Sequence, residues 1–196
     1  MLKKFGSSQA MSDYIDSKID GSFLPADIDF LGRYVRKLKA GDIYMEIGTE
    51  YGKSMASAIW QAEEGVKFYT CDLVDKPAEK EGMMSRREFF ESEGLDKVCT
   101  FIKDDSAKIA KRWQDELAMV FVDSEHTYAM VKKDIKAWYP HLKTGGYMLF
   151  HDYGDTQFTL YLAVDEYVRD SDKFGDFVKA QDMGLISSSM AGAVKT

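Results

Sequence analysis

The sequence predicts an α/β protein in which helices cover both faces of a doubly wound, mostly parallel sheet. Short apolar runs alternate with segments of helical periodicity along most of the chain, which is typical of strand–helix–strand units. The most apolar run, residues 118–122, is typical of a strand buried on both faces. Polar residues follow the runs, and in such sheets ligands bind outside the carboxyl ends of the strands.

Short apolar runs between turn residues predict five parallel strands, which are residues 43–47, 67–71, 98–102, 118–122 and 147–150. The first ends in a glycine-containing turn, the second ends at Asp72, and Gly145 and Gly146 lead into the fifth. Residues 177–180 and 185–189 are expected to form a closing antiparallel pair. The expected sheet therefore has seven strands.

Apolar residues at three- to four-residue spacing predict helices around these strands, which are residues 28–38, 53–64, 85–93, 107–113, 128–138 and 158–168. Pro25 and Asp27 open the first helix, which closes near Gly41. Gly94 stops the third helix. The fifth has to end before Pro140, because a proline disfavours helical backbone in the residue that precedes it.

The composition excludes several classes of partner. The chain has 196 residues, 45% of them hydrophobic, which is enough for one sizeable core. Lys and Arg number 26 against 33 Asp and Glu, a net charge of −7, so the clustered cations that phosphates or an anionic membrane require are not expected. No apolar run approaches the ~18 residues of a spanning helix, and no secretory signal is apparent. Cys71 and Cys99 fit neither a disulfide framework nor a zinc site, so we expect reduced thiols and a cytoplasmic location.

The turn after the first expected strand, residues 46–54, reads Glu-Ile-Gly-Thr-Glu-Tyr-Gly-Lys-Ser. Its glycines, Gly48 and Gly52, allow the backbone to approach a ligand closely. A dinucleotide fingerprint needs a third glycine, and a phosphate loop needs a glycine where Ile47 stands. Its two glutamates would repel a pyrophosphate. The turn therefore favours a ligand with a positive end, although the glycine pair could also be purely structural.

Two later strand ends carry carboxylates that suit a nucleoside. Asp72 lies 24 positions after Gly48, where a carboxylate can bind both hydroxyls of a ribose, but it could equally cap the following segment. Asp105 follows the third strand and could accept a hydrogen bond from an exocyclic amine. It could also be the N-cap of the helix expected at 107–113. Both interpretations of each residue stay open at this point.

Motifs at five strand ends form a set. Glu-x-Gly-x-x-x-Gly at 46–52 is followed by the acid at 72 and by Asp-Ser at 105–106. Val-Asp-Ser-Glu-His-Thr-Tyr at 122–128 and His-Asp-Tyr at 151–153 complete it. The set resembles class I S-adenosylmethionine-dependent methyltransferases, and the last two motifs resemble their small-molecule O-methyltransferase subgroup. Macrocin-type O-methyltransferases and cephalosporin-hydroxylase-like proteins are related to that subgroup. The resemblance covers residues 42–153 and implies a Rossmann-like methyltransferase fold.

The resemblance implies S-adenosylmethionine as the cofactor. Glu46 would lie near its amino group and Asp72 would hold its ribose, while Asp105 and Ser106 would lie beside the adenine. The complete set of implied cofactor-binding residues is Glu46, Gly48, Gly52, Asp72, Asp105, Ser106 and Asp123. S-adenosylmethionine carries a sulfonium and an ammonium but no phosphate, so an acidic pocket attracts it.

The resemblance also implies methyl transfer to the hydroxyl of a small-molecule acceptor. His126 is the expected general base, with Asp123 as the second catalytic residue, because an imidazole titrates near neutrality. In metal-dependent relatives Mg²⁺ is held by an aspartate at the place of Asp123 and by two acidic residues that end the fifth strand. His151 replaces one of these, so Asp123, His151 and Asp152 would better suit Mn²⁺, Fe²⁺ or Zn²⁺. Alternatively, His151 and Asp152 only order their loop.

Three other functions were weighed against methyl transfer. A non-catalytic adenosyl- or nucleotide-binding module would need the Gly48 turn and Asp72 but not His126. A metal-dependent hydroxylase or hydrolase would use the three candidate metal ligands. An NAD-dependent oxidoreductase is disfavoured by the acidic turn with two glycines.

We expect a single methyltransferase domain over residues 1–196. It would comprise an N-terminal helical extension (1–41), a cofactor-binding core (42–153) and a C-terminal helix with a strand pair (154–196). The expected partner is the small-molecule acceptor, with no nucleic acid and no membrane, and a homodimer stays open. The long charged segment 73–87 is the candidate for a mobile lid.

Overall fold

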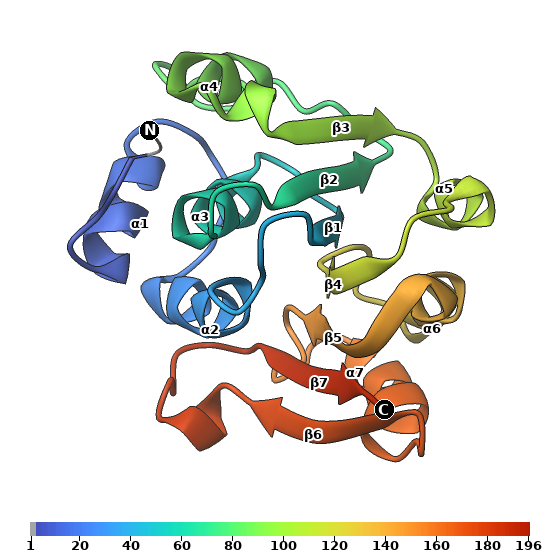
Figure 1. Ribbon diagram of the computed structural model, residues 1–196. Helices are drawn as coiled ribbons and strands as arrows, with labels where there is room; N and C mark the ends of the chain where they lie inside the picture. Colours follow the sequence, from blue (N-terminus) through green and yellow to red (C-terminus); the bar gives the residue numbers. More distant parts are fainter. Residues whose placement is uncertain (1–2) are drawn as a thin grey trace.

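A seven-stranded sheet forms the centre of the protein (Figure 1). The computed structural model describes residues 3–196. Its strand order is β3-β2-β1-β4-β5-β7-β6. The strands are β1 (Ile43–Ile47), β2 (Lys67–Asp72), β3 (Cys99–Lys103), β4 (Leu117–Val122), β5 (Leu142–Phe150), β6 (Phe174–Lys179) and β7 (Ala191–Lys195). Strands β1 to β5 are parallel, whereas β7 runs antiparallel to β5 and β6. The predicted fold class is confirmed.

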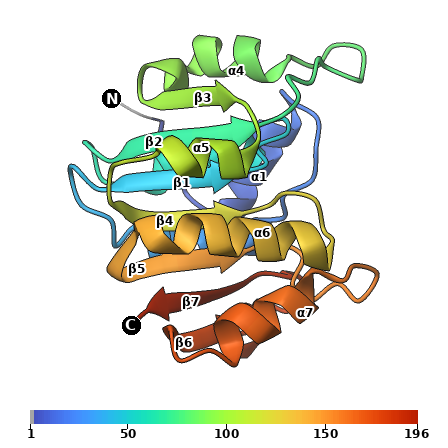
Figure 2. The same ribbon diagram turned by 90° about the vertical axis from the view of Figure 1, so that its right-hand side faces the viewer.

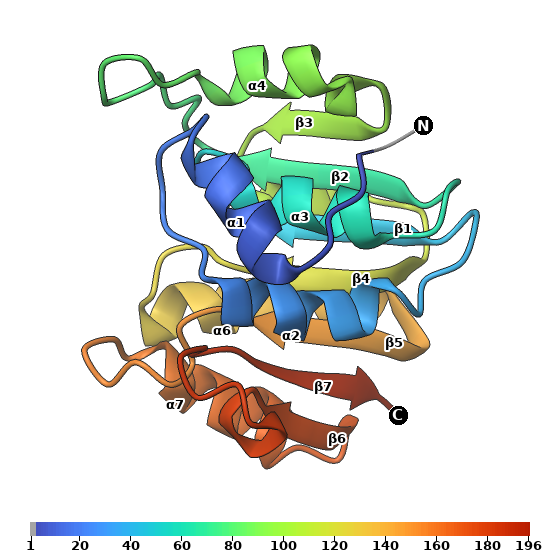
Figure 3. The ribbon, with the colours of Figure 1, turned by 90° about the vertical axis from the view of Figure 1, so that its left-hand side faces the viewer.

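Helices cover both faces of the sheet. They are α1 (Ser8–Asp16), α2 (Pro25–Val35), α3 (Lys53–Gln61), α4 (Arg86–Glu93), α5 (Ser106–Arg112), α6 (Tyr128–Trp138) and α7 (Leu160–Val164). Figure 2 shows α5, α6 and α7 on one face, and Figure 3 shows α1, α2 and α3 on the other. Each face has its own hydrophobic cluster, and apolar residues of α4 belong to the cluster of α1, α2 and α3.

Several helix ends match the predicted signals, although α2 ends at Val35 and not near Gly41. Pro25 is the first residue of α2. Ser85 caps α4 and forms a capping box with Glu88, and Gly94 ends the helix in a left-handed conformation. Helix α6 ends at Trp138, before Pro140, as its sequence requires. Local chemistry therefore sets these bounds.

The predicted position of the second strand of the closing pair is wrong. Residues 185–189 contain no strand, and Ile186 is 84% exposed. The strand that pairs with β6 is β7, whose first residues, Ala-Gly-Ala, have too little apolar surface to give a sequence signal. Their small size is what the position requires: a Cβ on Gly192 would overlap the side chain of Leu149 on β5. The expected last helix is also interrupted, because α7 continues as a π-helical turn over Asp165–Arg169.

The strand order reverses between β1 and β4, which places a topological switch point at their carboxyl ends. The carboxyl ends of β1, β2, β4 and β5 lie at the same edge of the sheet because these strands are parallel. The polar residues that follow them are thereby brought together. Over the described part of the chain, no helix has both the length and the apolar character needed to cross a bilayer.

Candidate active site

A cavity of about 410 Å³ opens at the switch point. Of the predicted site residues, it is lined by Gly48, Asp72, Asp105, Ser106, Asp123 and His126. Glu46, Gly52, His151 and Asp152 lie outside its lining. Its volume is within the ~300–1,000 Å³ range of small-molecule sites. The fold thus collects residues that span more than 70 positions of the sequence into one pocket.

The turn after β1 requires its two glycines for different reasons. Gly48 has φ +84°, and a Cβ there would overlap the carbonyl oxygen of Asp123 at the end of β4. Gly52 has φ +91° and begins α3, and a Cβ there would lie 2.6 Å from the ring of Phe90. Gly48 therefore lets the turn pass over β4 at the cavity wall, whereas Gly52 serves the packing of α3 against α4.

Glu46 lies beneath the turn and is fully buried. Its carboxyl group accepts hydrogen bonds from the hydroxyls of Tyr44 (3.0 Å) and Ser54 (3.1 Å). Burial, and then the nearby carboxylate of Asp123, raise the pKa of Glu46 to about 8. At neutral pH this group is largely protonated and braces the turn from inside.

Asp72 holds the backbone that surrounds the cavity mouth. One carboxylate oxygen accepts from the amide of Glu50 (2.9 Å), and the other accepts from the amide of Val74 (3.0 Å). Each oxygen can accept a second hydrogen bond, so capping its own loop leaves capacity for a ligand. In this geometry Asp72 can both cap the following segment and bind a ribose, so its two interpretations do not exclude each other.

Asp105 is the N-cap of α5, as one of its two interpretations predicted. Its side chain accepts from the amide of Lys108, and it forms an ion pair of 2.7 Å with Lys133 of α6. This lysine lowers the pKa of Asp105. Beside it, Ser106 accepts a hydrogen bond of 2.7 Å from the indole of Trp138. These contacts join α5 to α6 at the cavity wall.

A cluster of two imidazoles and two carboxylates lies beside the cavity, and two of its members, Asp123 and His126, line it. The Nε2 atom of His126 lies 3.0 Å from Asp152 and 3.7 Å from Asp123. Its ring stacks on Phe158, with ring centres 4.5 Å apart. The neighbouring carboxylates of Asp123 and then Asp152 raise the pKa of His126 to about 9. This imidazole is therefore mostly protonated at neutral pH, above the near-neutral titration that the sequence suggested.

His151 is the more buried imidazole of this cluster, and it links the cluster to the N-terminal region. Its Nδ1 atom is 3.0 Å from Asp152 and 3.4 Å from Asp123, and its Nε2 atom is 3.5 Å from Asp27 of α2. Burial disfavours the charged imidazole, but these carboxylates outweigh burial and raise the pKa of His151 well above its usual range. Asp27 is thus in contact with the cluster. The sequence indicated Asp27 only as the residue that opens a helix, a role in which its side chain accepts a hydrogen bond from the amide of Leu24.

Asp152 has an unusual backbone conformation for a residue other than glycine, with φ +54°. Its carboxylate contacts both imidazoles and accepts a hydrogen bond of 3.1 Å from Ser189. Although burial opposes ionisation, the two histidines hold the pKa of Asp152 far below its usual value. Strained backbone of this kind persists where the surroundings over-determine it, and it concentrates at functional sites.

Three groups in this cluster have the spacing of metal ligands. One ligand atom each from Asp123, His126 and Asp152 lie within 4.8 Å of one another. The sequence instead placed His151 with the two aspartates. His151 is the more buried of the two histidines and its second nitrogen faces Asp27, whereas His126 lines the cavity.

A family comparison explains this combination of fold and site. The model of a methyltransferase domain family matches residues 45–153 of the chain. The chain belongs to this methyltransferase family. The match, together with the fold, confirms the predicted resemblance to class I methyltransferases. The matched residues contain the Gly48 turn, Asp72, Asp105 and the His126 cluster. A search of curated proteins finds no significant match.

Solved structures, among them an O-methyltransferase and the methyltransferase MycE, have the same fold. An O-methyltransferase from Bacillus cereus in complex with S-adenosylhomocysteine is 11% identical, with a TM-score of 0.68 over 100% of this chain and 93% of that one. TrmN from Thermus thermophilus is 16% identical, with a TM-score of 0.63 over 90% of this chain and 50% of that one. MycE from the mycinamycin biosynthetic pathway, solved with Mg, S-adenosylhomocysteine and mycinamycin VI, is 16% identical, with a TM-score of 0.65 over 96% and 54%. The methyltransferase domain thus spans about half the length of TrmN and MycE.

Proposed function

We propose that this methyltransferase transfers a methyl group from S-adenosylmethionine to a hydroxyl of a small molecule, with His126 as the general base. The observation that carries the proposal is the arrangement of one cavity between two ends. Asp72, Asp105 and Ser106 follow β2 and β3 and line the end on one side of β1, whereas Asp123 and His126 follow β4 and line the end on the other side. The cofactor would bind over the first group, with its methyl group directed toward the second.

The charges of the cavity fit the cofactor. The lining carboxyl groups belong to Glu50, Asp72, Asp104, Asp105, Asp123, Glu125 and Asp134. The two lining lysines are both paired, Lys76 with Glu50 and Lys133 with Asp105. An acidic lining attracts the sulfonium and ammonium of S-adenosylmethionine and repels a dinucleotide. When bound, this cofactor supplies a methyl group on a positively charged sulfur.

The residues of the chain would bind the cofactor, orient the acceptor and deprotonate its hydroxyl. Asp72 has the free lone pairs to accept from ribose hydroxyls, and Asp105 and Ser106 would contact the adenine. His126 would remove the proton of the acceptor hydroxyl. Asp123 and Asp152 would stabilise the imidazolium that results, and the stack on Phe158 fixes the plane of the ring. Holding the reacting groups in line away from water supplies much of the remaining rate enhancement.

Two structural neighbours support a small-molecule hydroxyl as the acceptor. One is an O-methyltransferase, and the other is crystallised with mycinamycin VI. The imidazole at the cavity wall is the feature of this chain that suits an oxygen nucleophile, because a hydroxyl has to lose its proton on methylation.

Calorimetry with S-adenosylhomocysteine tests the cofactor assignment. We expect saturable binding, weakened by Asp72→Ala and unchanged by Asp115→Ala. Asp115 is an exposed aspartate between α5 and β4 and serves as the matched control. If the folded wild-type protein gave no heat of binding at about 1 mM ligand, the methyl-transfer proposal would be wrong, since that ceiling leaves less than ~4 kcal/mol of binding energy.

The spacing of Asp123, His126 and Asp152 favours a second candidate function, in which a divalent cation assists a hydroxylase, a hydrolase or the methyl transfer itself. Two carboxylates and one imidazole suit Mn²⁺, Fe²⁺ or Zn²⁺. The two roles of His126 exclude each other at Nε2, because a metal-bound nitrogen cannot accept a proton. Calorimetric titration with Mn²⁺ of the wild type and of His126→Ala separates them: stoichiometric binding that this variant abolishes assigns His126 to the metal.

A further inference from the structure

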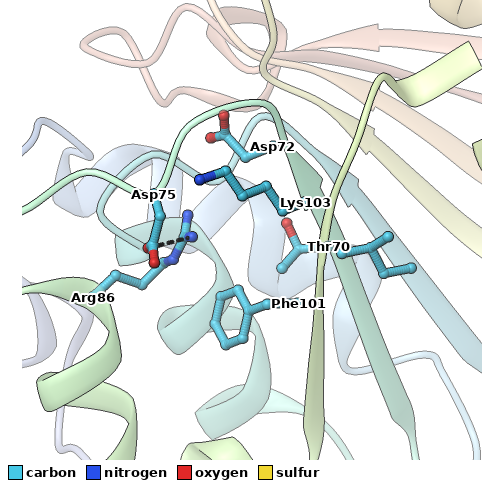
Figure 4. Close-up of a pocket in the computed structure, with 7 residues that line it drawn as sticks. Thr70, Asp72, Asp75, Arg86, Phe101 and Lys103 are labelled. Atoms are coloured by element: carbon cyan, nitrogen blue, oxygen red, sulfur yellow. Dashed lines mark hydrogen bonds and ion pairs between the residues drawn. The ribbon is translucent and has the colours of Figure 1, made fainter.

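A second cavity, of about 180 Å³, adjoins the active-site cavity and shares Asp72 with it. Figure 4 shows its lining residues, which come from β2 and β3, from the segment between β2 and α4, and from the first residue of α4. They are Thr70, Asp72, Asp75, Arg86, Phe101, Ile102 and Lys103. The methyl-transfer proposal uses none of them except Asp72.

Arg86 brings a buried positive charge to this cavity. Its side chain is only 9% exposed, and its guanidinium lies 4.8 Å from the ring centre of Phe101. One N–H group donates to the carbonyl oxygen of Glu50 (2.9 Å), and another donates to the carboxylate of Asp75 (2.9 Å). A guanidinium carries five such donors, and a buried cation needs a counter-anion.

Asp75 supplies that counter-anion, although its own side chain is largely open to solvent. Its side chain is 54% exposed, and it lies in a segment without regular secondary structure. Water and dissolved ions reach the exposed side of this ion pair and weaken it relative to a fully buried one. Because the carboxylate of Asp75 is half exposed, another anion can take its place beside Arg86.

Two further donors face the cavity without a partner among residues 3–196. The hydroxyl of Thr70 is buried and makes no hydrogen bond. Lys103 forms no ion pair within the same residues, and Figure 4 shows its ammonium group extended toward the Arg86–Asp75 pair. Asp72, by contrast, is already engaged by the amides of Glu50 and Val74. The two side chains of this cavity that lack any partner among the described residues are therefore both donors.

We propose that this cavity binds a small oxyanion, a phosphate or carboxylate group, held by Arg86, Lys103 and Thr70, with Asp75 occupying its place in the absence of ligand. The planar guanidinium matches two oxygens of such a group, the ammonium adds a point charge, and the hydroxyl donates to a third oxygen. The segment that carries Asp75 also contributes Val74 and Lys76 to the active-site cavity. An anion that displaces Asp75 thus acts on a segment that both cavities share.

Isothermal titration at constant ionic strength tests this proposal with three probes: inorganic phosphate, acetate and phenyl phosphate. We expect one-to-one binding of at least one probe. Lys103→Gln and Thr70→Val should each weaken it about tenfold or more. Lys103 is exposed and valine has the shape of threonine, so both variants should fold. Lys111→Gln, an exposed lysine of α5, is the matched control and should leave the affinity unchanged.

The direction in which Asp75→Asn changes the affinity for the anion decides whether Asp75 stands in for the ligand. If Asp75 stands in for the ligand, removing its charge removes a competitor, and the affinity for the anion should rise about threefold or more. Tighter binding of phenyl phosphate than of inorganic phosphate would identify an oxyanion carried on a larger ligand, and the reverse order would identify a free oxyanion. The proposal is overturned if no probe binds the wild-type protein. It is also overturned if Asp75→Asn weakens binding, or if Lys103→Gln leaves binding as it is.

Discussion

The polar side chains at the two ends of the active-site cavity have different kinds of hydrogen-bond and ion-pair partner. At the Asp72 end, comprising Asp72, Asp105 and Ser106, the partners are backbone amides, a surface lysine and an indole. At the His126 end, comprising Asp123, His126, His151 and Asp152, the partners are imidazoles whose pKa values are raised by the contact. The first end is held by loop and helix-cap contacts, and the second holds exchangeable protons and a strained residue. Under the proposed function, binding and chemistry would therefore be separated along one cavity.

The largest expected effect is a loss of turnover at the His126 end alone. For His126→Ala we expect turnover to fall by ~10²–10⁴-fold, the usual contribution of a general base. The affinity for S-adenosylhomocysteine should change by less than about threefold, because the cofactor contacts lie at the other end. The release of S-adenosylhomocysteine with a hydroxylated acceptor measures the first quantity and calorimetry the second. His141→Ala, outside the cavity, is the control, and a loss below tenfold would remove His126 from the role of base.

Gly48 joins the two ends, so a substitution there should damage both. Gly48→Ala places a Cβ into the carbonyl group of Asp123 and also imposes a left-handed alanine, and we expect a loss of at least ~3 kcal/mol in the free energy of unfolding. Gly41→Ala is the matched control: its φ is +92° but no atom lies within 4 Å of the added Cβ, so only ~1–2 kcal/mol should be lost. Urea unfolding of both variants measures the difference. Equal losses would show that the contact with Asp123 is relaxed at little cost.

The pH dependence should report the His126 end. A base must be neutral to accept a proton, and the pKa of His126 is raised to about 9, so the active fraction grows as pH rises toward that value. We expect kcat/KM for the acceptor to increase by about tenfold per pH unit between roughly pH 7 and 9 and then level off. The affinity for S-adenosylhomocysteine should follow pH much less steeply over this range. If kcat/KM did not change with pH over this range, His126 would not be a metal-free base whose pKa is raised by two carboxylates.

The smallest expected effect is at the Asp72 end. Asp72→Asn should weaken S-adenosylhomocysteine about tenfold, or ~1.4 kcal/mol, because an amide retains one acceptor oxygen but loses the charge. Turnover at saturating cofactor should stay within about threefold of the wild type. The ratio of the two effects, measured by calorimetry and by initial rates, is opposite to that expected for His126→Ala. If Asp72→Asn reduced turnover and left affinity intact, the separation of the two ends would be wrong.

Most of the fold was predictable because its elements carry local signals. The buried run of β4, the capping box of α4 and the proline after α6 each act through residues a few positions apart. Strand β7 could not be predicted in this way. Its Ala-Gly-Ala start is defined by the space that Leu149 of β5 leaves for it, and that space exists only in the assembled sheet.

The sequence by itself determined the family, the five parallel strands and the polar residues that follow them, among them Asp72, Asp105, Asp123 and His126, because each follows a strand whose pattern is local. Only the tertiary structure decided that Glu46 and Gly52 lie outside the cavity, that Asp27 joins the histidine cluster and that His126 has the metal-ligand spacing. It also decided the pKa of His126, which depends on two carboxylates contributed by different strand ends. Burial and long-range charge contacts arise between segments far apart in the chain, so no spacing within the sequence encodes them.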